Sequence, residues 1–313
     1  LNSVPADLKP KKVDVNESHI HIIWPDGHKT TISFKDIESL EKSRKPEKVL
    51  WMNDFIPNYF DWNDFLQIND TAIDAISNFI TSGVIIIKDA PSISNSLEEL
   101  APRLGPIREV LFERIHNVSV DGHVYNIAHT SLELPPHNDF ASYTWPPSVQ
   151  ALHMLVNECK GGRSTIVDGY AVLRDLRNDS PGYFDILSSF DVPFREFDEE
   201  NETYANEPMI RMNNEKEVTG FRYSNQLMQM IDPRKKNVAS FYEAYHELCN
   251  RVNSERYKSK FRLESGQVLL VSAHRVLHGR EEFKPDGKRH LQDAYYEMDN
   301  IENNLYLLKN LGN

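Results

Sequence analysis

Three residues of the chain could hold one metal ion between them. His137 and Asp139 are separated by a single residue, and His278 lies far downstream. Side chains two positions apart on an extended segment point to the same side, so His137 and Asp139 can reach one point. Two imidazoles and one carboxylate are the protein ligands that a non-haem Fe(II) oxygenase uses. We therefore predict an Fe(II) centre with His137, Asp139 and His278 as its ligands and catalytic residues.

An arginine shortly after the second histidine extends this prediction. Arg289 opens a segment, 289–296, whose composition is typical of a strand. A guanidinium can bind a carboxylate through two parallel hydrogen bonds, and three protein ligands leave room on iron for a 2-oxo acid and O2. We expect Arg289 to bind the far carboxylate of 2-oxoglutarate. Arg275 and Arg280 compete with it on spacing alone, and a surface ion pair is the ordinary role of an arginine.

Other classes of function remain open at this point. A His-x-Asp pattern occurs by chance in many chains, and a catalytically inactive protein kept for binding would not need to hold iron. A zinc hydrolase could use the same ligand types, but it would give Arg289 no role. Metal analysis distinguishes the inactive protein from an iron enzyme.

Composition excludes several classes of protein. The chain has 313 residues, 40% of them hydrophobic and 26% charged, which is typical of a globular protein. A net charge of -12 and the lack of a basic stripe argue against nucleic-acid binding. No apolar run approaches the ~20 residues of a membrane span. The two cysteines form no disulfide framework, so we expect a cytoplasmic protein; because the chain starts at Leu1, a mitochondrial targeting signal upstream stays open.

Turn residues and a charged stretch divide the chain. Three short strands are expected over residues 12–16, 19–24 and 29–34, with turn chemistry at 25–27. The charged stretch 41–48 reads as a linker. We expect a small β-rich N-terminal domain over 1–50 and the oxygenase domain over 51–313.

The larger part reads as many strands with a few helices. Apolar spacing predicts helices over 71–82 (capped by Asp70), 97–104 and 237–253, with a further helix starting at Ser180-Pro181. Strands are expected over 84–87, 150–156, 164–167, 268–272 and 290–298. This pattern predicts a mainly β fold with flanking helices, as in a sandwich or jelly roll.

Several stretches carry a resemblance that spans nearly the whole chain. They are Trp24-Pro25-Asp26-Gly27-His28, Pro136-His137-Asn138-Asp139, Gly161-Gly162-Arg163-Ser164, Val167-Asp168-Gly169, Val276-Leu277-His278-Gly279-Arg280 and Arg289-His290-Leu291. The chain resembles the γ-butyrobetaine dioxygenase and trimethyllysine dioxygenase family, a branch of the TauD-like Fe(II)/2-oxoglutarate oxygenases. The resemblance implies a double-stranded β-helix (jelly roll) domain behind a small N-terminal domain, a homodimer, and O2 and ascorbate as co-substrate and reductant. It also implies a small-molecule substrate of carnitine biosynthesis. The expectation of no nucleic-acid or membrane partner comes from the charge and composition described above.

The resemblance also implies substrate-binding residues. Family members that act on quaternary ammonium groups surround them with aromatic rings through cation–π attraction. The matching positions here are Phe112, His116, His129 and Tyr295, and only Tyr295 keeps the family's residue. Asn126 and Asn225 match positions that could hydrogen-bond a substrate carboxylate, although each could equally be an ordinary loop asparagine.

Two differences between this sequence and the family pattern leave questions open. The family's small domain carries a zinc site of three cysteines and one histidine; His28 matches that histidine, but no cysteine precedes it. The cysteines would fall before Leu1, so either truncation or true loss explains their absence, and structural zinc stays open. The altered ring positions likewise leave two substrate classes open. The first is a γ-butyrobetaine or trimethyllysine type of compound, which would be hydroxylated. The second is an unmethylated amino or carboxylic acid in natural-product tailoring, which would be hydroxylated, desaturated or cyclised.

Overall fold

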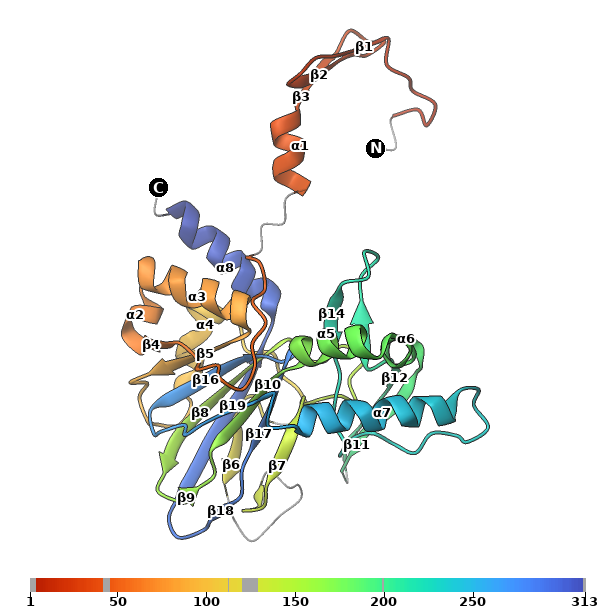
Figure 1. Cartoon of the computed structure of the whole chain (residues 1–313). Coiled ribbons are helices and arrows are strands. Elements are labelled where there is room, and N and C mark those ends of the chain that lie inside the picture. Colours follow the sequence, from red (N-terminus) through yellow and green to blue (C-terminus); the bar gives the residue numbers. More distant parts are fainter. Residues whose placement is uncertain (1–3, 42–45, 112, 120–128, 199, 312–313) are drawn as a thin grey trace. The chain divides into compact units, whose positions relative to one another are not determined.

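The chain forms two compact units, Leu1–Pro46 and Glu47–Asn313, in the computed structural model (Figure 1). The structure describes residues 4–41, 46–111, 113–119, 129–198 and 200–311. The division expected from the sequence is after residue 50, close to this boundary. None of the helices in the described ranges combines the length and the apolar composition that a bilayer span requires.

The first unit is a small antiparallel sheet followed by a helix. Its elements are β1 (Lys12–Val15), β2 (His19–Ile23), β3 (Lys29–Ser33) and α1 (Phe34–Glu41). The three strands confirm the expected ones, whereas α1 had not been predicted. Gly27, at φ +88°, provides the tight turn between β2 and β3. His28 is exposed beside this turn, and a zinc site there stays a prediction.

A six-stranded sheet forms one wall of the second unit. Its order is β4-β5-β16-β8-β19-β6, and all neighbours are antiparallel except the parallel pair β4 and β5. The strands are β4 (Tyr59–Asp61), β5 (Val84–Lys88), β6 (His116–Ser119), β8 (Val149–Asn157), β16 (Gln267–Ser272) and β19 (Arg289–Tyr296). The β-branched run of β5 is fully buried, as a central strand requires.

A four-stranded antiparallel sheet forms the second wall, in the order β15-β10-β17-β7. Its strands are β7 (Leu134–His137), β10 (Ser164–Asp168), β15 (Lys258–Phe261) and β17 (Val276–Arg280). Ile86, Met154 and Leu269 of the larger sheet share one buried cluster with Ile166 and Val276 of the smaller one. The two walls therefore pack face to face, which makes this unit mainly β.

Short strand pairs extend this unit. They are β9 (Lys160–Gly161) with β18 (Phe283–Lys284), β11 (Val192–Phe197) with β12 (Glu202–Glu207), and β13 (Ile210–Met212) with β14 (Val218–Phe221). The β11 strand matters for the site, because it brings Glu196 to the cavity described below.

Helices cover the outer faces of both walls (Figure 1). On the six-stranded sheet these are α2 (Trp62–Leu66), α3 (Asp70–Ser82), η1 (Ser96–Leu100), α4 (Ala101–Leu104) and α8 (Met298–Leu311). Beside the four-stranded sheet they are α5 (Gly169–Asp179), α6 (Pro181–Ser189) and α7 (Val238–Asn253). The C-terminal α8 had not been predicted. The cap of α3 was assigned wrongly: Asn69, not Asp70, precedes the helix, and its side chain accepts the Ala72 N–H at 2.8 Å.

Candidate active site

The structure brings His137, Asp139 and His278 together at the open end of the smaller sheet. His137 ends β7 and pairs in register with His278 of β17, while Asp139 follows two residues after His137. Nε2 of His137 lies 3.1 Å and Nε2 of His278 lies 3.9 Å from Oδ1 of Asp139. One ligand atom from each residue lies within 4.8 Å of the others, and the described residues contain no second such cluster. Two imidazole nitrogens and one carboxylate oxygen around one point fit a mononuclear Fe(II).

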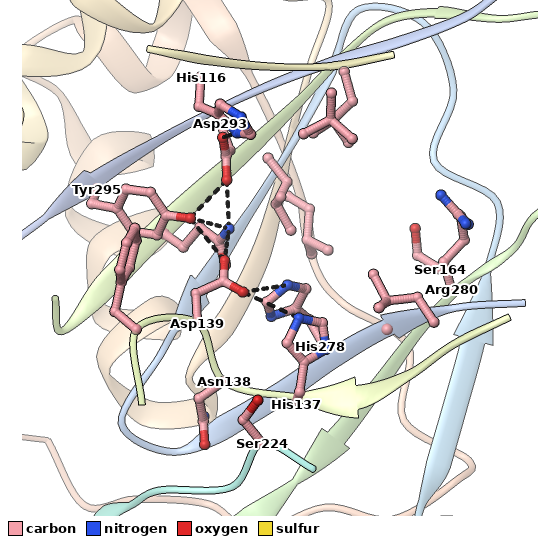
Figure 2. Close-up of a pocket in the computed structure, with 18 of the residues that line it drawn as sticks. His116, His137, Asn138, Asp139, Ser164, Ser224, His278, Arg280, Asp293 and Tyr295 are labelled. Atoms are coloured by element: carbon pink, nitrogen blue, oxygen red, sulfur yellow. Dashed lines mark hydrogen bonds and ion pairs between the residues drawn. The ribbon is translucent and has the colours of Figure 1, made fainter. Parts of the chain in front are cut away.

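Backbone contacts fix the orientation of this segment. Nδ1 of His137 lies 2.9 Å from the carbonyl of Pro135, so a proton on Nδ1 leaves Nε2 available as a ligand atom. The intervening Asn138 points away from the carboxylate of Asp139 in Figure 2. Its Nδ2 donates to the Ala273 carbonyl at 2.6 Å, and its Oδ1 accepts the Tyr223 N–H at 2.8 Å. Asn138 therefore anchors the loop between the candidate ligands His137 and Asp139 through these two hydrogen bonds.

Asp139 is joined to a second carboxylate through two shared donors. Tyr295 Oη lies 2.8 Å from Oδ2 of both Asp139 and Asp293. Nε2 of Gln150 donates to the same two oxygens at 2.7 and 2.9 Å. The amide and the phenol together offer three protons, which is enough to serve both carboxylates.

This hydrogen-bond network shifts the pKa values of Asp139 and Tyr295. Burial alone would raise the pKa of Asp139, but His278, His137 and the Tyr295 hydroxyl hold it below its ordinary value. Burial, and then the charges of Asp139 and Asp293, raise the pKa of Tyr295 well above its ordinary value. The phenol therefore keeps its proton and acts as a donor to the carboxylates.

A cavity of about 140 Å³ lies between the two walls and contains the cluster, so its occupants must be small molecules. Arg280 and Ser164 line one end together with Arg289, whose charge acts on Arg280. His116 and Asp293 line the other end together with Glu196, whose pKa responds to the charge of His116. Figure 2 shows Arg280 and Ser164 on the opposite side of the ligand histidines from Asp293 and His116. Leucines 134, 152, 227, 263, 269 and 291 line the space between. The cavity thus has a cationic end, an acidic end and the metal cluster between them.

Arg289 has the properties of a carboxylate-binding group. Among the described residues its buried Nε has no hydrogen-bond partner, and none of them forms an ion pair with its guanidinium. Burial lowers its pKa to about 10, so it stays charged at neutral pH. Arg275, by contrast, is fully committed to a buried ion pair with Asp168 at 2.8 Å. Arg280 also lines the cavity, and it donates to the carbonyls of Thr130 and Leu132.

The predicted substrate residues divide into three groups. His116 and Tyr295 line the cavity. His129 does not line it but lies behind His116, with ring centroids 5.7 Å apart. Asn225 is exposed outside the lining and accepts a hydrogen bond from the Tyr245 hydroxyl at 2.6 Å. Phe112 and Asn126 lie outside the described residues.

Several polar residues of this cavity were not predicted from the sequence, among them Gln150, Glu196 and Asp293. Burial, and then the charge of Asp139, raise the pKa of Glu196 to about 7. Asp293 could have been found from the sequence, because residues 289, 291, 293 and 295 alternate along one face of β19. No local pattern indicated Gln150 or Glu196, whose positions depend on how β8 and β11 pack.

Comparison with known proteins supports an oxygenase. Residues 49–295 match the taurine catabolism dioxygenase TauD, TfdA family. The γ-butyrobetaine dioxygenase of Pseudomonas sp. strain AK-1 is 28% identical over 317 residues, which cover 98% of this chain and 83% of that protein. The mitochondrial trimethyllysine dioxygenase of Mus musculus is 28% identical over 324 residues, which cover 98% of this chain and 76% of that protein.

Solved structures support the same fold. The non-haem iron oxygenase OrfP, in complex with Fe and α-ketoglutaric acid, superposes with a TM-score of 0.56 at 16% identity, covering 73% of this chain and 80% of its own. A taurine dioxygenase from Burkholderia xenovorans gives a TM-score of 0.56 at 14% identity, covering 74% of this chain and 82% of its own. The second unit therefore has the jelly-roll fold of these oxygenases, as the sequence predicted.

Proposed function

The chain belongs to the taurine catabolism dioxygenase TauD, TfdA family, and from that premise we propose that it hydroxylates an unactivated C–H bond of a small amino acid or betaine. It is an Fe(II)/2-oxoglutarate-dependent dioxygenase. The observation that carries the proposal is the cluster of His137, Asp139 and His278 on the wall of a cavity with an uncommitted arginine.

In this proposal His137, Asp139 and His278 hold Fe(II). Bound Fe(II), with O2 and 2-oxoglutarate, supplies an oxidation of the substrate C–H bond that releases succinate and CO2. Arg289 binds the far carboxylate of 2-oxoglutarate through its guanidinium, which the described residues leave without an acid partner. Charge-assisted hydrogen bonds of this kind fix both position and orientation.

The surrounding side chains orient the reactants. Tyr295 and Gln150 hold Oδ2 of Asp139, so that its Oδ1 faces the two histidines. The Pro135 carbonyl holds His137 in the tautomer that presents Nε2. Leucine side chains on the walls exclude water from the space between the two polar ends. Which carbon reacts then depends on where the cavity holds the substrate relative to the metal.

Two substrate classes fit this chemistry. The relatives named above point to γ-butyrobetaine or trimethyllysine, the substrate type of carnitine biosynthesis. The polar side chains His116 and Asp293 at the acidic end favour the second class, an unmethylated amino or carboxylic acid that is hydroxylated, desaturated or cyclised. The proposal includes a homodimer, which light scattering would test. It also includes ascorbate as the reductant, which assays without ascorbate would test.

The test is succinate formation by the purified chain with Fe(II), ascorbate and 2-oxoglutarate. The panel contains γ-butyrobetaine, trimethyllysine and unmethylated small amino acids. We expect one class to stimulate succinate formation and Asp139→Ala to abolish it. Full activity of Asp139→Ala would contradict the ligand assignment, and an absence of metal-dependent 2-oxoglutarate turnover would contradict the proposed function itself.

A further inference from the structure

The acidic end of the cavity carries a buried carboxylate whose hydrogen bonding is incomplete. Asp293 is only 4% exposed, yet its Oδ1 has no hydrogen-bond partner in the part of the chain that the structure describes. Its Oδ2 is served by Tyr295 and Gln150, as described above. Oδ1 faces Nδ1 of His116 at 3.4 Å, an ion-pair separation that is long for a hydrogen bond. A buried carboxylate oxygen of this kind is destabilising unless a donor or a cation reaches it.

Carboxyl groups outnumber basic groups at this end among the described lining residues. Asp293 and Glu196 contribute two carboxyl groups, and His116 contributes one imidazole. Asp139 is not counted among them, because its charge faces the metal site. A positively charged N–H group of a bound molecule would supply the close donor that Oδ1 of Asp293 does not find among the described residues.

The lining is poorly suited to a cation that has no N–H bond. A trimethylammonium group is held by the faces of several aromatic rings. Phe140 and Tyr295 are the only phenyl or phenol rings among the described lining residues, and they meet edge to face with centroids 4.9 Å apart. A primary ammonium, in contrast, offers three N–H donors to carboxylates.

We propose that Asp293, with His116 and Glu196 beside it, binds a substrate ammonium group through N–H donors, so that the substrate is an unmethylated amine. This inference rests on the proposed function and chooses between its two substrate classes. The bound nitrogen would lie close to the metal ligands, because Oδ2 of Asp293 and Oδ2 of Asp139 each lie 2.8 Å from one phenol oxygen. The opposite, arginine end of the cavity is left for 2-oxoglutarate. Along β19, Arg289 and Asp293 are about 13 Å apart at the usual rise of a strand.

Matched pairs of compounds test this assignment, because each pair shares one carbon skeleton. The pairs are 4-aminobutyrate with γ-butyrobetaine and lysine with trimethyllysine. Calorimetry on the full chain with Fe(II) and 2-oxoglutarate, without O2, reports binding free of turnover, and succinate formation in air reports coupling. We expect the amine of at least one pair to bind about tenfold more tightly than its trimethylated partner. Tighter binding of the trimethylated member, or no binding by either amine, would overturn the proposal.

The variant Asp293→Asn gives a second, independent readout. It keeps the size of the side chain and an oxygen for Tyr295 and Gln150, and it removes the charge. We expect the affinity for the preferred amine to fall about tenfold or more, with a much smaller change for the trimethylated partner. Asp74→Asn, on the exposed side of α3, is the charge-matched control. It should keep the wild-type ratio of the affinities for the amine and for its trimethylated partner.

The outcomes separate this inference from the proposed function. A preference for trimethylated compounds, with turnover that still depends on Asp139, would reject the ammonium site and keep the oxygenase. An Asp293→Asn variant with an unchanged ratio of affinities would also reject it. If that variant does not fold, the preference of the wild-type chain within each pair still decides the question.

Discussion

The phenol oxygen of Tyr295 lies 2.8 Å from Oδ2 of Asp139, so a residue that lines the cavity is hydrogen-bonded directly to a proposed metal ligand. The two residues belong to different walls of the jelly roll: Tyr295 lies on β19 of the six-stranded sheet, and Asp139 follows β7 of the four-stranded sheet. Because one hydroxyl joins them, changes at the substrate end of the cavity can be transmitted to the metal.

Removing this hydroxyl should weaken metal binding. In Tyr295→Phe, Asp139 and Asp293 would share only the amide of Gln150. Loss of a partner that orients a metal ligand typically lowers metal affinity by about 10- to 100-fold, and we expect a decrease in this range in an anaerobic Fe(II) titration.

The neighbouring tyrosine is the matched control for this change. The hydroxyl of Tyr296 points to the opposite side of β19 and donates to the Leu97 carbonyl at 2.8 Å. Tyr296→Phe should reduce the free energy of unfolding by about 1 kcal/mol and leave the Fe(II) affinity unchanged. Equal metal affinities for the two variants would show that the Tyr295 hydroxyl does not support Asp139.

Arg289→Lys should weaken 2-oxoglutarate binding. Lysine keeps the positive charge but cannot form the two parallel hydrogen bonds of a guanidinium. We expect the KM for 2-oxoglutarate to rise about tenfold or more, with a smaller change in the KM for the substrate. Steady-state succinate assays at varied 2-oxoglutarate concentration measure this, with the exposed Arg234→Lys as control. An unchanged KM for 2-oxoglutarate would move the assignment to Arg280.

Asn138→Ala should destabilise the loop between His137 and Asp139. The change leaves the buried Tyr223 N–H and the Ala273 carbonyl without their partners. We expect a loss of about 2 kcal/mol or more in the free energy of unfolding, measured by denaturant titration of the metal-free chain. A stability equal to the wild type would show that these two bonds do not anchor the loop.

His153 makes the stability of the chain depend on pH. It is fully buried, and neither of its ring nitrogens has a hydrogen-bond partner. Burial lowers its pKa from 6.5 to about 4. As the pH falls from 6.5 to 4, His153 becomes protonated in the unfolded chain but stays neutral in the folded chain. The free energy of unfolding therefore falls. The contribution is fully present above pH 6.5 and amounts to about 3 kcal/mol at most.

The variant His153→Leu should therefore remove this dependence and stabilise the chain. Leucine needs no hydrogen bond at a buried position, so we expect a gain of about 1 kcal/mol at pH 7 and a larger gain near pH 5. Urea titrations across this range measure it, with His246→Leu on the exposed side of α7 as the control. If the two variants showed parallel pH profiles, the wild-type dependence would have to come from other groups.

Local chemistry explains what could be predicted from the sequence. The alternation of side chains on a strand places His137 and Asp139 on one side, and the preference of iron for imidazole and carboxylate ligands adds His278. The apolar spacing of residues 237–253 likewise anticipated α7, and the β-branched run at 84–87 anticipated β5. The helices α1, α2, α5 and α8 were not predicted.

Tertiary structure decided everything that depends on residues far apart in the chain. The register that pairs Tyr295 with Gln150 across β19 and β8 determines which donors reach Asp139. The same register brings Asp293 to the cavity, whereas Asn225 lies outside its lining and bonds to Tyr245 of α7. The sequence by itself determined the ligand types and hence the chemistry, because these follow from residue type and local spacing. The tertiary structure decided the charge of the substrate end, because that charge arises where strands from separate parts of the chain meet.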